Sequence, residues 1–332
     1  MNTIPLLQFP LGAYLRVLRW MGVSDQLVYS LCSRNTKKAI ISLNLKTQRI
    51  EFSVGEFIYI TIENMDYISF STVFKLENNF PNNQFIAREG TEVFERGPLW
   101  VKRECNFGKF ELKEWIDHFC EVLHHSKIDE LRFSNENNFN YIEPVQKAIK
   151  GIQIGCLVQN GGLSKDFAKN VLESFPSYEK LSVIQLPYDG HEQNKVLIQN
   201  LKSFCIRIGE EFKLNELLLS NSERIVVYSS LFTEKDFNGF LKMWISGSNP
   251  RLKDIFMFGK LQLGKNSFDK NDILKGIEYN QIPLDSNEVY RDYINETEYR
   301  ERKLAGGFRV GRPDATTAVI KIKQNIFWFI VE

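Results

Sequence analysis

The sequence lacks the features that mark several large classes of protein. No apolar run reaches the length of about 20 residues that a membrane-spanning helix requires. The N-terminus does not show the order of basic flank, apolar core and cleavage site that is typical of a signal peptide. With 42 basic and 41 acidic residues, the net charge is +1, which offers no electrostatic footprint for nucleic acid or an anionic membrane. We therefore expect a chain that binds neither.

Cysteine is scarce and unpatterned. The cysteines are odd in number and form no Cys-x-x-Cys pair: Cys32, Cys105, Cys120, Cys156 and Cys205. Such a pattern favours free thiols in a reducing compartment over a disulfide framework. The sequence therefore predicts a location in the cytoplasm or the nucleus.

Patterns that carry chemistry are also missing. We find no nucleophile elbow, no Cys/His pairing and no kinase-type set of motifs. Cys120 and His124 lie one helical turn apart, with Cys105, His118 and His125 nearby, and these residue types are zinc ligands. The paired spacings of zinc sites are absent. We expect no catalytic residue, metal or cofactor, and leave a metal-dependent enzyme as the alternative.

The first forty-odd residues predict three short helices with more apolar surface than they can bury. In the first helix, one face carries Leu11, Tyr14, Leu15, Leu18 and Met21, and the other side carries Ala13, Val17 and Trp20. The second helix has a stripe of Leu27, Val28, Leu31 and Cys32, and a third run covers 36–43. Pieces of this size have too little interior to bury both sides. One face must therefore be covered by the rest of the chain or by a partner.

The remainder of the chain predicts a mixed α+β or α/β fold. Residues 46–110 read as antiparallel β segments and loop, and the tail ends in a short β-meander. Between them, predicted strand centres fall near Leu131, Ile154, Val183, Ile206, Val226 and Ile255. Their separations, by subtraction, are 23, 29, 23, 20 and 29 residues. This spacing matches the period of about 20–29 residues of leucine-rich repeats, with one strand and one helical segment per unit. We predict a leucine-rich-repeat-like solenoid over 111–277, with an ordinary open α/β sheet as the alternative.

Two stretches resemble a known family. Phe9-Pro10, Val17-Leu18, Met21, Asp25 and the run 29–34 resemble the F-box of the nematode group that carries a type-2 F-box-associated domain, although Phe9 replaces the usual Leu. The stretch 224–252 resembles the signature of that second domain. The matching positions are Thr233, Asp236, Asn238, Phe240, Leu241, Lys242, Trp244, Ile245, Gly247, Asn249 and Pro250. The resemblance divides the chain into an F-box (1–45), β segments (46–110), the F-box-associated repeats (111–277), and a charged loop with the meander (278–332).

The resemblance implies a non-catalytic adaptor that binds the Skp subunit of a cullin-based ubiquitin ligase through its F-box. The residues it implies for this contact are Phe9, Pro10, Leu11, Tyr14, Leu15, Leu18, Met21, Leu27, Leu31 and Cys32. The C-terminal domain would bind a protein substrate that the sequence does not identify. The alternative is a stand-alone interaction solenoid that is not attached to a ligase.

A charged segment, 278–303, is the predicted site of substrate binding. It spaces tyrosines among alternating acids and bases, and long loops of this kind are often functional. Because Tyr and Arg often anchor interfaces, we predict that Tyr290, Tyr293 and Arg300 contribute. The alternative is a solvated insertion with a surface helix over 287–302.

Overall fold

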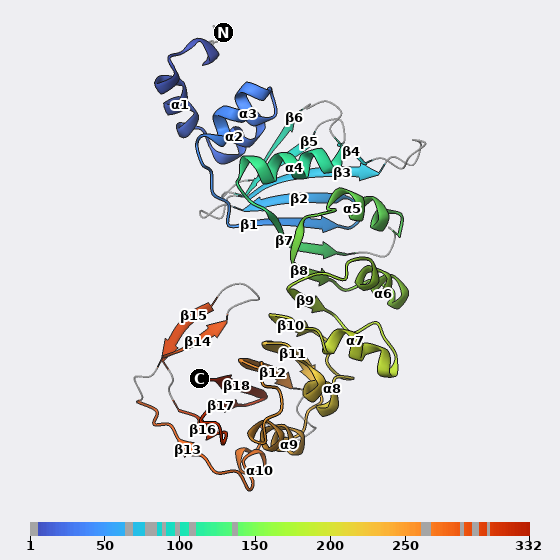
Figure 1. Ribbon diagram of the computed structural model, residues 1–332, viewed down its shortest axis with the longest axis vertical. Coiled ribbons are helices and arrows are strands. Elements are labelled where there is room, and N and C mark those ends of the chain that lie inside the picture. The colour runs from blue at the N-terminus through green and yellow to red at the C-terminus, as the bar shows by residue number, and fades with distance from the viewer. Residues whose placement is uncertain are drawn as a thin grey trace. The chain divides into compact units, whose positions relative to one another are not determined.

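The computed structural model describes residues 6–63, 69–76, 85–87, 91–96, 100–105, 111–134, 139–259, 267–285, 289–293, 299–303 and 306–332, and in several strands only the backbone. The chain forms two compact units, Met1–Tyr178 and Glu179–Glu332 (Figure 1). None of the helices in the described ranges combines the length and the apolar content needed to span a membrane.

The first unit begins with a short 3-10 turn and three helices. They are η1 (Leu6–Gln8), α1 (Leu11–Trp20), α2 (Val23–Ser30) and α3 (Arg34–Ile41). α3 begins at a capping box in which Ser33 and Thr36 each bond the backbone N–H of the other. Such a box satisfies two N–H groups that the first helical turn leaves without partners. The start of α3 is therefore fixed by local sequence.

The sheet of the first unit mixes antiparallel and parallel strands. Its order is β8-β7-β1-β2-β3-β4. The strands are β1 (Arg49–Val54), β2 (Ile58–Glu63), β3 (Ser69–Leu76), β4 (Phe85–Ala87), β7 (Lys127–Phe133) and β8 (Gln153–Gln159). Strands β1 to β4 pair antiparallel, whereas β1 with β7 and β7 with β8 pair parallel. The predicted segments 46–110 and 111–277 therefore share one sheet; the four-part division itself stays a prediction.

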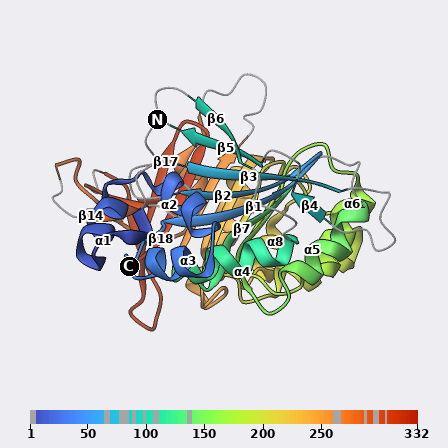
Figure 2. The same ribbon diagram turned by 90° about the horizontal axis from the view of Figure 1, so that it is seen from above.

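Helices cover one face of this sheet. They are α4 (Leu112–Val122), α5 (Ile142–Ala148, preceded by η2, Phe139–Tyr141) and α6 (Lys165–Ser174) (Figure 2). In β1 every second residue is buried, so Ile50, Phe52 and Val54 form part of the core. A separate hairpin is formed by β5 (Thr91–Arg96) and β6 (Trp100–Cys105).

The second unit has parallel strands followed by an antiparallel meander. The sheet order is β13-β16-β17-β18-β12-β11-β10-β9. The parallel strands are β9 (Lys180–Val183), β10 (Ser203–Ile206), β11 (Arg224–Ser230) and β12 (Asp254–Gly259). The antiparallel strands are β13 (Asn280–Gln281), β16 (Phe308–Gly311), β17 (Thr317–Lys323) and β18 (Ile326–Val331). The helical segments are η3 (Gly190–Gln193), α7 (Asn194–Leu197), α8 (Leu214–Leu219), α9 (Glu234–Ile245) and α10 (Lys270–Ile273).

The strand–helix repeat of the sequence is present in this architecture. Each of the predicted strand centres lies in a strand, in the order β7, β8, β9, β10, β11 and β12. Within each unit these strands neighbour one another in sequence order and run parallel. A mixed α/β fold with N-terminal helices and a large sheet is confirmed, while the assignment to the leucine-rich-repeat class stays a prediction.

Helix α9 contributes several large rings to the core of the second unit. The ring of Phe237 stacks on Phe327 with centroids 4.2 Å apart, and Trp244 meets Phe329 edge-on at 4.9 Å. The guanidinium of Arg312 lies 4.1 Å from the centre of the Trp244 ring. These contacts tie α9 to the C-terminal meander, far away in the sequence.

The segment 278–303 differs from the sequence prediction of a loop. Its described residues include two antiparallel strands, β14 (Val289–Tyr293) and β15 (Tyr299–Lys303), so the alternative of a helix over 287–302 is also wrong. The register places Asp292 opposite Arg300 and Arg291 opposite Glu301. Opposite charges at directly paired positions stabilise antiparallel strands, so the alternation that suggested a solvated loop fits a hairpin.

We expect Trp244→Ala to lower the free energy of unfolding by about 3–5 kcal/mol, because it replaces a large buried side chain with a small one. Trp244 is 1% exposed. The neighbouring Met243 is 46% exposed, so Met243→Ala on the same helix is the matched control and should change stability by less than about 0.5 kcal/mol. Urea unfolding of both variants measures the difference, and equal midpoints would contradict the packing described here.

Candidate partner-binding surface of the N-terminal helices

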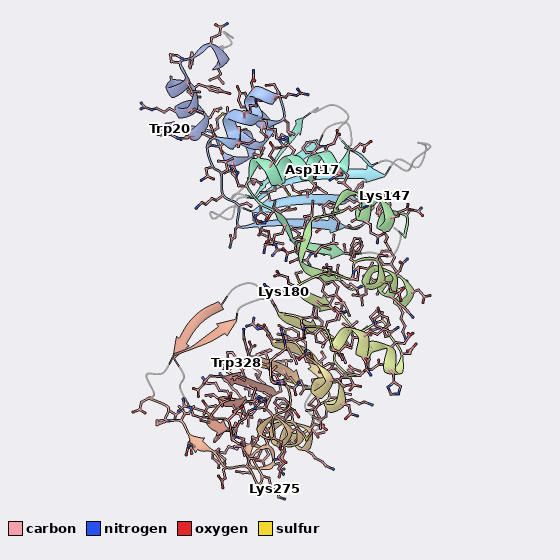
Figure 3. All side chains as sticks on the ribbon, in the orientation of Figure 1. Trp20, Asp117, Lys147, Lys180, Lys275 and Trp328 are labelled. Carbon is pink, nitrogen blue, oxygen red and sulfur yellow. The ribbon has the colours of Figure 1, made fainter. Side chains whose placement is uncertain are left out.

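Helix α1 has apolar residues on both sides, and the structure buries only one of them. Leu18 is fully buried, and Tyr14 is buried beside it. On the other side, Trp20 is 87% exposed and Val17 is 36% exposed, and Leu11, at the start of the side that carries Leu18, is also exposed, at 69%. Figure 3 shows Trp20 on this helix. Large apolar side chains that are this exposed on one helix make α1 the candidate surface for a partner.

The buried side of α1 is fixed to α2 by polar contacts as well as packing. The hydroxyl of Tyr14 donates to the hydroxyl of Tyr29 over 3.3 Å, and the side-chain amide of Gln26 donates to the carbonyl of Leu18 over 2.8 Å. Burial is the main cause that raises the pKa of Tyr14, and the bond with Tyr29 adds to it. These contacts decide which side of α1 faces outward.

Helices α2 and α3 are in turn fixed to α4, one of the helices that cover the sheet of the first unit. Ser30 on α2 lies 2.7 Å from Nε2 of His118, and Lys37 on α3 forms an ion pair with Glu121 at 2.6 Å. Nε2 of His124 lies 3.2 Å from the carbonyl oxygen of Ile41. Helices α2 and α3 are therefore held on α4, and none of these three contacts involves α1.

The bond between Ser30 and His118 has a defined direction. The Ser30 hydroxyl donates its single proton to the carbonyl of Leu27, at 2.6 Å. Nε2 of His118 must therefore carry a proton and donate it to Ser30. Burial, followed by the positive charge of Lys37, lowers the pKa of His118 from 6.5 to about 4 although Glu121 opposes the shift. His118 is thus neutral at neutral pH.

The residues predicted for the Skp contact divide into three groups. Phe9, Pro10, Leu11 and Cys32 are exposed, Leu15, Met21 and Leu31 are half-buried, and Tyr14, Leu18 and Leu27 are buried in the chain's own core. The buried group supports the surface and cannot touch a partner in this conformation. Two exposed residues, Val17 and Trp20, were not among the predicted contacts. The apolar second side of the helix was their signal in the sequence.

The surface around these residues carries positive charge. Helix α1 contains Arg16 and Arg19, both exposed, and no acidic residue. Arg34 at the start of α3 is also exposed. Acidic residues on a partner that covers α1 would therefore favour binding, because they would face these arginines.

The other sites considered from the sequence do not assemble in the described residues. No group of three or more metal-ligating side chains occurs there, and the histidines near Cys120 have other partners, such as Asp129 at 2.7 Å from His125. The side chain of Cys105 lies outside the described part. Tyr290, Tyr293 and Arg300 are on β14 and β15, but their side chains also lie outside it, so their role stays a prediction.

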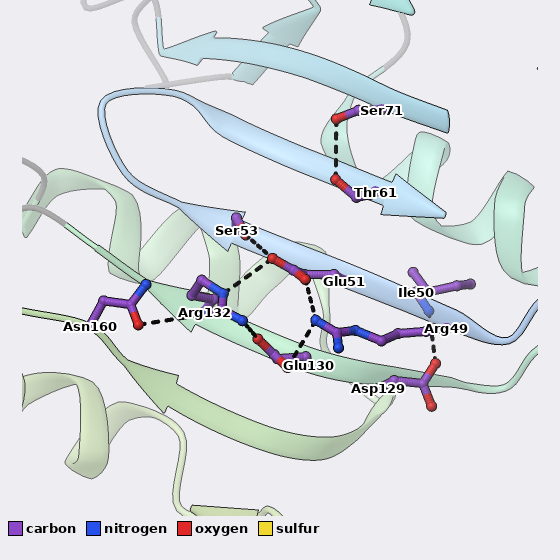
Figure 4. A network of polar contacts seen from close by, with 10 residues as sticks. All are labelled: Arg49, Ile50, Glu51, Ser53, Thr61, Ser71, Asp129, Glu130, Arg132 and Asn160. Carbon is purple, nitrogen blue, oxygen red and sulfur yellow. Dashed lines mark hydrogen bonds and ion pairs between the residues drawn. The ribbon is translucent and has the colours of Figure 1, made fainter. Parts of the chain in front are cut away.

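A further polar cluster lies on β1 and β7 (Figure 4). Arg49 and Arg132 each form ion pairs with both Glu51 and Glu130. Burial would raise the pKa of Glu51, but the bond from Ser53 and the two arginines lower it. Because two cations and two anions face one another, the cluster neutralises itself and serves to align two parallel strands.

Comparison with known proteins identifies two segments of this chain. Residues 6–48 match the family model of the F-box domain, and residues 192–257 match the model described as F-box associated. The chain is 24% identical over 326 residues to the F-box associated domain-containing protein sdz-33 of Caenorhabditis elegans, covering 98% of this chain and 93% of that protein. No solved structure matches.

The chain is thus an F-box protein of the nematode type that carries a type-2 F-box-associated domain, as its sequence resemblance predicted. F-box domains generally bind the Skp adaptor within Skp–cullin–F-box ubiquitin ligases.

We expect a buried and an exposed leucine of α1 to differ in their effect on stability. Leu18→Ala should lower the free energy of unfolding by about 2–5 kcal/mol, because it opens a cavity in the helical core. Leu11→Ala removes the same atoms from an exposed position and should change it by less than about 0.5 kcal/mol. Urea unfolding tests both, and a large loss for Leu11→Ala alone would contradict the burial of these two leucines described here.

The stability of the first unit should also depend on His118. Its pKa is lower in the folded chain (about 4) than the ordinary value of 6.5, so the folded state binds fewer protons between these values. Its contribution is therefore complete above pH 6.5 and is lost as the pH falls toward 4, up to about 3 kcal/mol at about 1.4 kcal/mol per pH unit.

His118→Gln is the control for this dependence, because the glutamine amide can donate to Ser30 and does not titrate. Urea unfolding at pH 7, 6 and 5 should show a weaker loss of stability in this variant than in the parent chain. An unchanged pH dependence would mean that other groups cause it.

Proposed function

We propose that this chain is a non-catalytic substrate adaptor of a Skp–cullin–F-box ubiquitin ligase, acting in the cytoplasm or nucleus. The observation that carries the proposal is the exposure of Leu11, Val17 and Trp20 on a helix that buries only Tyr14 and Leu18 in the chain's own core. Helices that only capped the α/β unit would be expected to turn their large apolar side chains toward it. Here α2 and α3 contact that unit, and α1 keeps an apolar surface for a partner.

The proposed Skp contact consists of the exposed and half-buried members of the predicted set together with the two residues on the outer side of α1. They are Phe9, Pro10, Leu11, Leu15, Val17, Trp20, Met21, Leu31 and Cys32. The buried residues Tyr14, Leu18 and Leu27 hold this surface in place. The cullin would be recruited through the Skp subunit, without a contact of its own.

Substrate binding is assigned to the F-box-associated region, for which a leucine-rich-repeat-like arrangement is the proposed architecture. The family signature in this region is supported by packing roles. The side-chain amide of Asn249 donates to the carbonyl oxygens of Leu217 and Ser220, and that of Asn238 donates to those of Ile273 and Lys275. Residues that fix the backbone in this way build a scaffold and do not react with a substrate. This supports an adaptor in preference to an enzyme.

We expect Leu11→Asp to weaken binding of the Skp adaptor by at least about tenfold. Burying one leucine contributes about 1.5–3 kcal/mol, and the aspartate would add an unpaired charge at the interface. Isothermal titration of the full chain with the purified Skp adaptor measures the change.

Leu284→Asp is the matched control, since Leu284 is 83% exposed and lies in the other unit. It should bind the Skp adaptor with unchanged affinity. If the parent chain did not bind Skp at all, the stand-alone interaction protein would be the better description.

A further inference from the structure

The sheet of the second unit has two faces of different character. Phe327 and Phe329 of β18 contact the rings of α9, so the residues that alternate with them point to the opposite face. The register places Trp328 beside Phe256, and Phe256 beside Val226, in one row. The next row contains Ile326, Phe258 and Tyr228. We call these two rows the aromatic face.

The aromatic face is partly open to solvent. Tyr228 and Phe258 are directly paired, and each is 42% exposed. The Phe256 ring lies 6.1 Å from Tyr228 and 6.0 Å from Trp328, which joins the rows into one cluster. A bulge with Ser229 at φ +53° follows Tyr228. Bulges occur often beside functional sites, where they redirect a side chain.

The charges at the borders of the aromatic face have one sign. Lys321 is paired with Trp328 and Lys323 with Ile326, so both lysines end these rows on β17. Arg207, directly after β10, is exposed at the other border, where strand alternation places it opposite the core residue Ile206. The residues of the two rows include no carboxylate.

Two carboxylates on the same strands, among the described residues, are bound to arginines. Asp254, at the buried end of β12, accepts hydrogen bonds from Arg224 at 3.0–3.1 Å. Glu332 accepts two bonds of 2.8 Å from Arg309. On the first unit, the cluster of Arg49, Glu51, Glu130 and Arg132 balances its own charge.

We infer that the aromatic face binds an acidic peptide segment of the substrate, with aromatic or aliphatic side chains on the rings and carboxylates toward Lys323 and Arg207. This deepens the adaptor function proposed above and rests on it for the identity of the partner as a substrate. The choice of an acidic segment follows from charge complementarity. A basic segment would meet cations at both borders, and like charges at an interface cost binding energy. Exposed aromatic rings provide the apolar anchor that such interfaces need.

The test uses the full chain and two labelled synthetic peptides, measured by fluorescence anisotropy. One peptide combines Asp and Glu with Phe and Leu; the other has Lys in place of every acid. We expect the acidic peptide to bind at least about tenfold more tightly, and this preference to shrink at high salt because exposed charges are screened. Equal affinities, or no binding of the acidic peptide, would overturn the inference.

Variants locate the binding on the aromatic face. Arg207→Glu with Lys323→Glu should weaken binding of the acidic peptide at least about tenfold, and Phe258→Ala should do the same by removing an anchor. Lys195→Glu with Lys275→Glu makes the same charge change at exposed sites elsewhere in this unit, and Met243→Ala removes an exposed side chain from α9. Both controls should bind like the parent chain. If they weaken binding as much as the variants of the aromatic face, the site is not there.

Skp binding by the same variants separates the two proposals. The variants of the aromatic face should bind the Skp adaptor with unchanged affinity, and Leu11→Asp should retain the acidic peptide. Loss of peptide preference with Skp binding intact would reject only the aromatic face. Peptide binding without any Skp binding would reject only the ligase adaptor.

Discussion

The attachment of the N-terminal helices to α4 is the constraint on which the rest of the functional surface depends. A three-helix piece of this size cannot bury two apolar sides. The bond from His118 to Ser30 and the ion pair of Lys37 with Glu121 use one side of α2 and α3. α1 packs on the remaining side of α2 through Leu18 and Tyr14, and nothing in the described residues covers its outer face. The exposed apolar surface follows from this order of packing.

The described residues of the F-box-associated signature have structural roles in and around α9. Thr233 and Asp236 form a capping box that starts α9, and Phe237, Phe240 and Trp244 bury its inner face on β18. Asn238 and Asn249 satisfy backbone carbonyls at neighbouring turns. Each of these residues fixes a position of the backbone. The proposed binding surface is then supplied by other residues, such as Tyr228 and Phe258, whose rings lie on the opposite face of the sheet.

The two units place different chemistry on strands of similar construction. On β1 and β7 the charged residues form ion pairs with one another. Their charges are therefore already compensated within the chain. On β11, β12 and β18 the aromatic face carries Tyr228, Phe256, Phe258 and Trp328, with lysines on the neighbouring strand β17. A partner therefore gains more from the second surface, because it desolvates apolar rings and meets charges of one sign.

The sequence by itself determined much of the architecture. The spacing of apolar runs located every parallel strand from β7 to β12, and local capping and helical periodicity located α3, α6 and α9, because these signals lie within a few residues. It also showed that α1 is apolar on both sides. It did not show that Leu18 lies inside and Trp20 outside, since that depends on contacts with Tyr29 and Gln26 on the next helix. The hairpin of β14 and β15 was missed because its pairing joins charges that look solvated when they are read one residue at a time. The aromatic face was likewise decided by tertiary structure, which brings together strands from residues 224 to 331.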